Sequence, residues 1–167
     1  LGIRIVTDNG ELLYANRAIL DFFGYDSIDE MRAIPTRERY TPESYAEFQT
    51  RREKRKRDEF VPSEYKISIV RKDGEIRHLS VSRKRTTWNG TNQFQTIYQD
   101  ITERSRADAA LLQAYSEMNA IFSASGDSII IINNDYTIRR LNEDAAHLFG
   151  VSVTGVLGKK CYDVLGT

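Results

Sequence analysis

The hydrophobic pattern of the chain changes its period at residues 97–104, and this change limits the folds that the chain can adopt. Before this stretch apolar residues tend to recur at every second position, which is typical of strands. After it, over residues 107–122, they recur at every third and fourth position, which predicts a helix. A strand is therefore expected to pass directly into a helix.

The junction between them carries the side chains that a helix start requires. The first amides of a helix lack partners, and a short oxygen-bearing side chain can accept hydrogen bonds from them. Asp100, with Glu103 three residues on as in a capping box, or Thr102 could provide this cap. Glu103 also favours the positive end of the helix dipole. Asp100, Ile101, Thr102 and Glu103 are therefore expected to couple the strand to the helix.

Composition excludes several classes of protein. The chain has 167 residues with 24 basic and 24 acidic side chains, so no global field would attract nucleic acid or an anionic membrane. The single cysteine excludes an internal disulfide and suits a reducing cytoplasm. No apolar run approaches the roughly 20 residues that span a bilayer. Because the sequence starts at Leu1 without a leader, we expect a cytoplasmic fragment of a longer protein.

The order of the expected elements is strand, strand, short helices, longer helix and three further strands, which is an α+β arrangement. Turn residues separate the strands, and caps such as Asn16 and Thr41 precede the helices. Gly24 can end the first helix in the left-handed conformation. Asp26 and Ser27 are alternative caps for the second. The strands are expected at residues 2–7, 12–15, 65–70, 76–87 and 93–101, with turns at Asp8-Asn9-Gly10, 71–74 and 88–90.

The front of the chain recurs near its end. A shift of 126 positions aligns Ile3 with Ile129, Asn16 with Asn142 and the Phe-Gly pair at residues 23–24 with the pair at 149–150, and no gap is needed. Chance could match a few apolar positions, but a cap asparagine and a helix-ending Phe-Gly pair in one register indicate an internal repeat. The second copy ends before its later strands.

Three groups of residues carry a resemblance to a known family. They are the Asn-to-Phe-Gly segment in both copies, Arg71-Lys72-Asp73-Gly74 before a strand, and Asp100-Ile101-Thr102-Glu103-Arg104. Their order resembles PAS domains, the small sensory modules of bacterial signalling proteins. The resemblance implies a five-stranded antiparallel sheet with short helices on one face. It also implies a PAS domain at 1–102, a coiled-coil-type signalling helix at 103–125 and the truncated start of a second PAS domain at 126–167.

No catalytic or metal-binding motif is found in the sequence, so catalysis is not expected within these residues. In haem-binding PAS relatives the iron ligand usually comes from the longer helix, here expected over residues 42–57, which has no histidine. His78 is interpreted as a surface or partly buried strand residue, and His147 as solvent-facing. Cys161 lies where flavin-binding relatives place a reactive cysteine, but the residues around it differ. Neither haem nor flavin is therefore expected, Cys161 is interpreted as a small buried hydrophobe, and the protein should be colourless.

Residues 51–57 hold six basic side chains and one acidic one. Such a run also suits a nucleic-acid or nuclear-targeting role. Cations at a helix C-terminus favour the dipole, however, and a solvated charged face is the common outcome. No nucleic-acid partner is predicted.

The helix after the junction shows two apolar stripes. Leu112, Tyr115, Asn119 and Phe122 form one stripe, and the other follows a spacing of four, three, four and three at Ala107, Leu111, Ala114, Met118 and Ile121. The helix could cover its own domain, or pair with a second copy. The double stripe is wide enough for both contacts at once. Because the helix leaves one compact domain and enters the next with no other surface to lie on, a parallel homodimer is predicted.

The resemblance also implies a function. It predicts a sensory module that binds a small ligand or a partner and passes the change to an output domain in the same chain, of the histidine kinase or cyclic-dinucleotide type. No direct membrane contact is expected. Two alternatives stay open at this point: a constitutive dimerisation spacer with no ligand, and a haem- or flavin-bound redox sensor.

Overall fold

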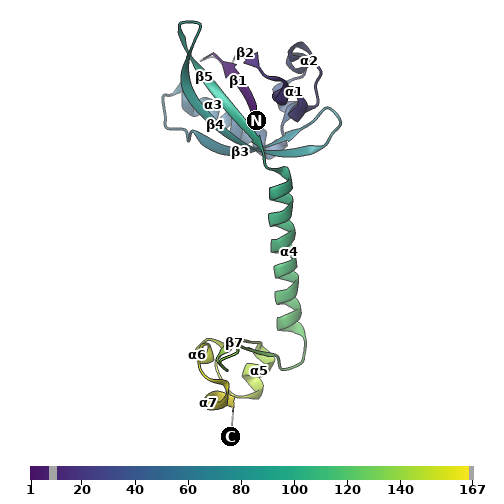
Figure 1. Cartoon of the computed structure of the whole chain (residues 1–167), viewed down its shortest axis with the longest axis vertical. Helices are drawn as coiled ribbons and strands as arrows, with labels where there is room; N and C mark the ends of the chain where they lie inside the picture. The colour runs from purple at the N-terminus through teal and green to yellow at the C-terminus, as the bar shows by residue number, and fades with distance from the viewer. Residues whose placement is uncertain (8–10, 166–167) are drawn as a thin grey trace. The chain divides into compact units, whose positions relative to one another are not determined.

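The computed structural model describes residues 1–7 and 11–165, so the predicted Asp8-Asn9-Gly10 turn lies outside the described residues. The chain divides into two compact units, Leu1–Arg106 and Ala107–Thr167. Each unit is described by itself below, with the elements labelled as in Figure 1.

The first unit is built on a five-stranded antiparallel sheet, which confirms the predicted fold class. The spatial order is β2 (Leu12–Ala15), β1 (Gly2–Val6), β5 (Thr91–Asp100), β4 (Ile76–Trp88) and β3 (Glu64–Val70). The last strand in the chain order is thus the central one. The central strand β5 is therefore also the strand that leads directly out of the sheet domain.

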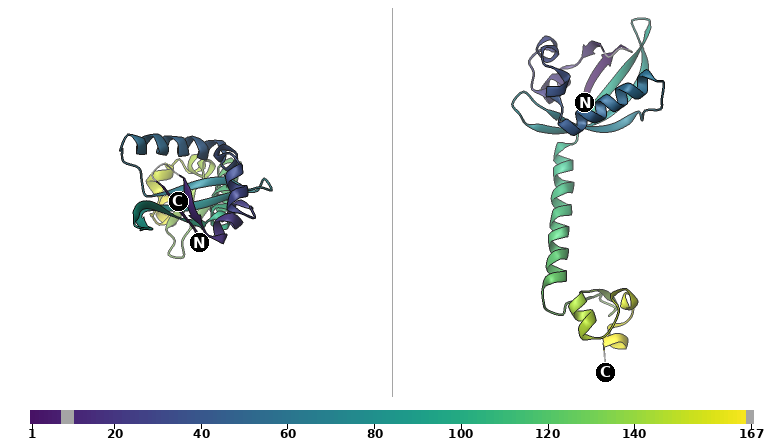
Figure 2. Two further views of the ribbon diagram at one scale, coloured as in Figure 1. Left: turned by 90° about the horizontal axis from the view of Figure 1, so that it is seen from above. Right: turned by 180° about the vertical axis from the view of Figure 1, so that it is seen from behind.

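Helices cover one face of this sheet, and Figure 2 shows the longest of them, α3, running across it. Asn16, Ser27 and Thr41 each accept an amide hydrogen bond at a helix start, so Ser27 rather than Asp26 is the second cap. Gly24 ends the first helix at φ 76°, in the left-handed region as predicted. The helices are α1 (Arg17–Phe23), α2 (Ile28–Ala33), the 3-10 turn η1 (Thr36–Arg39) and α3 (Pro42–Lys56).

The core lies between these helices and the sheet. Phe23, Ile69 and Leu79 are at most 1% exposed and form its centre. Around them pack further apolar and aromatic side chains from all layers, namely Ile19, Leu20, Tyr25, Met31, Tyr40, Ile67, Val81 and Tyr98. The long β4–β5 hairpin closes at Asn89 and Gly90, both at positive φ, as the Asn-Gly pair predicts.

The second unit begins within α4 (Thr102–Ala124) and continues through a hairpin and three short helices. These elements are β6 (Ile130–Ile132), β7 (Ile138–Leu141), α5 (Glu143–Leu148), α6 (Val153–Val156) and α7 (Cys161–Leu165). Its small core gathers around Ile138, Leu141 and Ala145.

The two asparagines of the repeat make the same hydrogen bonds. The side-chain oxygen of Asn16 accepts from the amide of Ile3 at 2.9 Å, and that of Asn142 accepts from the amide of Ile129 at 3.0 Å. Each oxygen also caps the helix that follows. One side chain thus fastens a strand to a helix start in both copies, as expected for a true internal repeat.

Candidate ligand pocket and strand-to-helix junction

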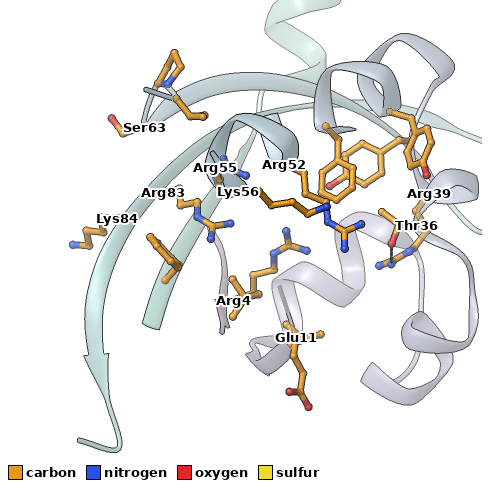
Figure 3. Close-up of a pocket in the computed structure, with 18 of the residues that line it drawn as sticks. Arg4, Glu11, Thr36, Arg39, Arg52, Arg55, Lys56, Ser63, Arg83 and Lys84 are labelled. Atoms are coloured by element: carbon orange, nitrogen blue, oxygen red, sulfur yellow. Dashed lines mark hydrogen bonds between the residues drawn. The ribbon is translucent and has the colours of Figure 1, made fainter. Parts of the chain in front are cut away.

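A pocket of about 1440 Å³ lies between the sheet face and the helical layer of the first unit (Figure 3). The sheet contributes Arg4 from β1, Phe94 from β5 and Arg83 from β4. The opposite wall comes from η1, from one side of α3 and from the segment 58–63 that follows it. Both layers of the fold are therefore needed to form it.

Three polar side chains lie abreast under this pocket, on neighbouring strands of the sheet. Thr96 is paired with Arg4 of β1 on one side and with Arg83 of β4 on the other. Directly opposed residues of an antiparallel pair project from the same face. The side chains of Arg4 and Arg83 consequently point into the same space, as Figure 3 shows.

Aromatic rings hold both guanidinium groups in place. The guanidinium carbon of Arg4 lies 5.2 Å from the ring centre of Tyr98, and that of Arg83 lies 4.1 Å from the ring centre of Phe94. Tyr98 and Phe94 stand two positions to either side of Thr96 on β5, so they share its face. Cation–π contacts orient an arginine without using its hydrogen-bond donors. The ring contacts therefore leave the N–H donors unoccupied, although a side-chain hydrogen bond to Tyr40 also acts on Arg4.

The hydrogen bonding of these arginines is incomplete. The Nε atoms of Arg4, Arg39 and Arg83 and the hydroxyl of Thr96 are buried and have no partner among the described residues. Burial, followed by the neighbouring charge of Arg55, lowers the pKa of Arg83 to about 10. Burial likewise lowers the pKa of Arg39. Arg4 differs from both: burial lowers its pKa, but nearby tyrosines, with Tyr98 the strongest, outweigh burial and raise it. The site therefore disfavours the charges of Arg83 and Arg39 and favours that of Arg4.

The pocket concentrates basic residues in a chain whose net charge is zero. Ten basic and three acidic side chains line it, an excess of seven positive charges. The three acids are Glu11, Asp58 and Glu59, and the bases are Arg4, Arg32, Arg37, Arg39, Arg52, Arg55, Lys56, Arg83, Lys84 and Arg85. Even where single pairs are screened, such a concentration makes a local positive potential.

The basic run at residues 51–57 belongs in part to this pocket. Arg52, Arg55 and Lys56 line it. Arg51 instead stacks over the ring of Tyr65, at 4.3 Å from its centre. Five of the seven residues of the run are exposed, as in a solvated face, and helical spacing turns Arg55 and the exposed Arg52 and Lys56 toward the pocket.

Arg4, Thr96 and Arg83 were not predicted from the sequence as site residues. A charge within an apolar strand reads as solvent-facing unless the layer above it is known. One signal was present, since the repeat aligns Arg4 with Ile130. The arginine is therefore not a shared feature of the two copies.

At the other end of β5 the strand joins α4 through side-chain hydrogen bonds. Oδ1 of Asp100 accepts from the amide of Thr102 at 2.9 Å and from its hydroxyl at 2.5 Å. The hydroxyl oxygen of Thr102 in turn accepts from the amide of His78 on β4 at 3.0 Å. Of the two candidate caps, Asp100 thus holds the first helical amide, and Thr102 bonds the helix start to the sheet.

Ion pairs surround this junction. Arg77 of β4 donates to Oδ2 of Asp100 at 3.3 Å and to Glu75 at 3.2 Å. Arg106, one turn into α4, donates to the other oxygen of Glu75 at 3.3 Å. These contacts, with that to Arg77 the largest, lower the pKa of Glu75. The start of α4 is consequently tied to the β3–β4 turn as well as to β4 itself.

The first apolar stripe of α4 is exposed in the single chain. Leu111 is 72% exposed and Ile121 is 70% exposed, and Ala107, Ala114 and Met118 are also exposed. The second stripe is partly covered by its own chain, because Arg140 donates to Asn119 at 2.8 Å and stacks over the ring of Phe122. The first stripe therefore has more uncovered apolar surface for a partner than the second.

The remaining candidate residues lie elsewhere. His78 is half-buried on β4, where its Nδ1 bonds to the hydroxyl of Ser68, and His147 is exposed, as predicted. Cys161 is half-buried beside the core of the second unit. Among the described residues no group of three His, Cys, Asp or Glu side chains is placed to share a metal ion. No helix among the described residues 1–7 and 11–165 is both long enough and apolar enough to cross a bilayer.

The first unit has the five-stranded antiparallel sheet, with helices on one face and a long helix after the last strand, that the sequence resemblance implies. A family model described as the PAS fold matches residues 2–101, and a model described as a PAS domain matches residues 116–167. The chain belongs to the PAS family.

Individual proteins are similar to this chain, which spans only a small part of the length of the curated relative that it matches. Sporulation kinase E of Bacillus subtilis (strain 168) is 26% identical over 93 residues, which cover 56% of this chain and 12% of that protein. A sensory box histidine kinase/response regulator from Burkholderia thailandensis E264 has a similar fold, with a TM-score of 0.54 and 15% identity over 71% of this chain and 90% of that one. A PAS domain from Desulfitobacterium hafniense aligns with a TM-score of 0.47 and 20% identity, over 59% of this chain and 91% of that one.

Proposed function

We propose that residues 1–102 form a sensory module that binds a small molecule in the pocket and relays its occupancy to α4. The observation that carries this proposal is the course of β5. Phe94 of β5 lines the pocket, and Asp100 at the end of the same strand holds the first amide of α4. A ligand that shifts β5 would therefore act directly on the cap of the helix.

A second strand supports the same route. Arg83 of β4 lines the pocket, and His78 of β4 donates its amide to the hydroxyl of Thr102. Two neighbouring strands thus connect the pocket to residues 100–103, which we propose as the relay. The coupling free energies that allosteric proteins use, about 1–3 kcal/mol, are similar in size to one helix cap.

We further propose that α4 pairs with α4 of a second copy as a parallel dimer. The exposed stripe from Ala107 to Ile121 supports this pairing, since apolar residues at a four-three spacing are buried in a coiled coil. In this reading residues 103–125 are the signalling helix and residues 126–167 are the front of a second PAS domain. The dimer would work in the cytoplasm and control an output domain in the same chain, of the kinase or cyclic-dinucleotide type.

Mass spectrometry of the natively purified 167-residue chain tests the sensor against a spacer that binds no ligand. We expect a small molecule to be retained under native conditions and released on denaturation. An Arg83→Gln variant should retain less of it, whereas Lys66→Gln, which removes an exposed charge outside the pocket, should retain as much as the parent. Equal masses for native and denatured protein in every sample would favour the spacer.

A further inference from the structure

We infer that the pocket binds a small oxyanion with at least two negative charges, carried by carboxylate or phosphate groups, between Arg4 and Arg83. This inference rests on the proposed function, because it names the class of ligand for the same pocket. Its basis is the row that Arg4, Thr96 and Arg83 form across three strands, with three polar groups that face one space and lack partners.

The chemistry of this row matches an oxyanion. A guanidinium presents several N–H donors in a planar fork that fits carboxylate and phosphate oxygens, and a hydroxyl can donate to either. The ring contacts of Arg4 and Arg83 orient both forks and use no donor. The guanidinium groups of Arg4 and Arg83, on either side of the Thr96 hydroxyl, therefore suit a molecule with more than one charged oxygen group.

The protein does not satisfy the whole row by itself. Buried charges are normally paired, yet the Nε atoms of Arg4 and Arg83 have no partner in the described chain. After burial, the strongest charged influence on Arg83 is another cation, Arg55. In the second copy Ile130 occupies the position of Arg4 and packs against the core of that unit. The fold therefore does not require an arginine at this place in the hairpin.

A small molecule fits this arrangement better than a polymer. Arg4 and Arg83 are half-buried, and residues of α3 and of segment 58–63 line the opposite wall of the pocket. Phosphates on the outside of a nucleic acid or a bilayer would meet the exposed cations Arg52, Lys56 and Lys84 before they met the row. These outer charges would instead attract a small anion and raise its rate of binding.

Thermal unfolding of the 167-residue chain with two probe anions tests the inference. Citrate represents carboxylates, pyrophosphate represents phosphates, and sodium chloride at equal ionic strength controls for screening. Ligands that bind the folded state raise the unfolding temperature by mass action. We expect at least one probe to raise it at millimolar concentration while chloride does not, and the better probe identifies which oxyanion the row prefers.

Variants locate the effect within the pocket. Hydrogen bonds to charged groups contribute enough that Arg4→Gln and Arg83→Gln should each weaken binding about 10- to 100-fold. Without anions Arg83→Gln should be at least as stable as the parent, because burial and the charge of Arg55 lower the pKa of Arg83. Arg4→Gln should instead lose some stability, because the pKa of Arg4 is raised in the folded state. Lys66→Gln removes the same charge from an exposed strand position and should respond to anions as the parent does.

Three results would overturn the inference. The first is that neither probe stabilises the parent more than chloride. The second is that Arg4→Gln and Arg83→Gln keep the full response, which would place the anions elsewhere. The third is that a single-stranded oligonucleotide binds more tightly than either probe, and that Lys66→Gln weakens its binding as much as Arg4→Gln and Arg83→Gln do. If an uncharged molecule is retained in native mass spectrometry, the sensor proposal stands and only the oxyanion is wrong. If nothing is retained and no probe binds, both proposals are wrong.

Discussion

Asp100→Ala should fray the start of α4 and leave the sheet intact. The substitution removes the acceptor for the Thr102 amide at 2.9 Å and for its hydroxyl at 2.5 Å. It also removes the ion pair with Arg77 at 3.3 Å, in which both side chains are about one quarter exposed. Loss of a cap costs about 0.5–2 kcal/mol, and a partly exposed pair adds roughly 0–1 kcal/mol. We expect a local loss of about 1–2 kcal/mol.

Hydrogen exchange measured by mass spectrometry provides the assay. A change of one or two kcal/mol alters an opening equilibrium by a factor of roughly 5–30, so residues 103–112 should exchange faster by that factor. Residues 65–70 of β3 serve as the internal reference and should not change. Asp100→Asn keeps an acceptor oxygen but loses the charge, and should show a smaller effect.

Thr102→Ala provides an independent version of the same test. It should also fray residues 103–112, and in addition it leaves the amide of His78 without its acceptor, so exchange at His78 should rise. If Asp100→Ala and Thr102→Ala both exchange like the parent across residues 103–112, the junction is a passive connector. The relay would then have to use another contact.

Three further predictions address other parts of the chain. Leu111→Glu should lose roughly 1.5–3 kcal/mol of apolar burial per helix and add like-charge repulsion between the two helices. Light scattering should therefore show a monomer for this variant, and dimers for the parent and for the control Gln113→Glu. A monomeric parent contradicts the pairing. Because the pKa of Glu75 is lowered in the folded state, its contribution to stability should be present above about pH 4.3 and be lost as the pH falls through the lowered value. The unfolding free energy of Glu75→Gln should therefore fall less steeply on acidification than that of the parent. Parallel pH profiles for the two proteins contradict this prediction. Asn16→Ala leaves the amide of Ile3 without its acceptor, while the amide of Ile19 keeps the backbone oxygen of residue 16. It should cost about 1–3 kcal/mol in denaturant unfolding, and no loss would mean that the repeat does not depend on its asparagine.

Much of the fold was predictable because its local signals agree with its tertiary structure. The strand predicted at residues 12–15 matches β2 at both ends, and Asn16, Thr41 and Gly24 cap or end helices as expected. These features depend on the hydrogen bonding of a few neighbouring residues, which a sequence displays directly. The short turn η1 was missed, since its Thr-Arg-Glu-Arg sequence carries neither an apolar period nor a side-chain cap.

The site was predictable only where it is local. Asp100 and Thr102 could be identified because a cap acts on residues next to it in the chain. Arg4 and Arg83 could not, because they are far apart in the sequence and meet only through their common pairing with Thr96. Whether a strand arginine faces water or a pocket depends on the strand register and on the layer packed above the sheet. The hydrophobic periodicity of the sequence gives no information on either of these.

The continuity of α4 has a consequence for insertions and deletions in it. The helix runs without interruption from Thr102 to Ala124, and each residue turns it by about 100°. Removing a single residue between Leu111 and Met118 would rotate the later half of the exposed stripe away from the earlier half by that angle. Removing seven would rotate it by only about 20°, since two turns hold 7.2 residues. The phase of the helix thus makes length, and not only residue identity, a constrained property of this segment.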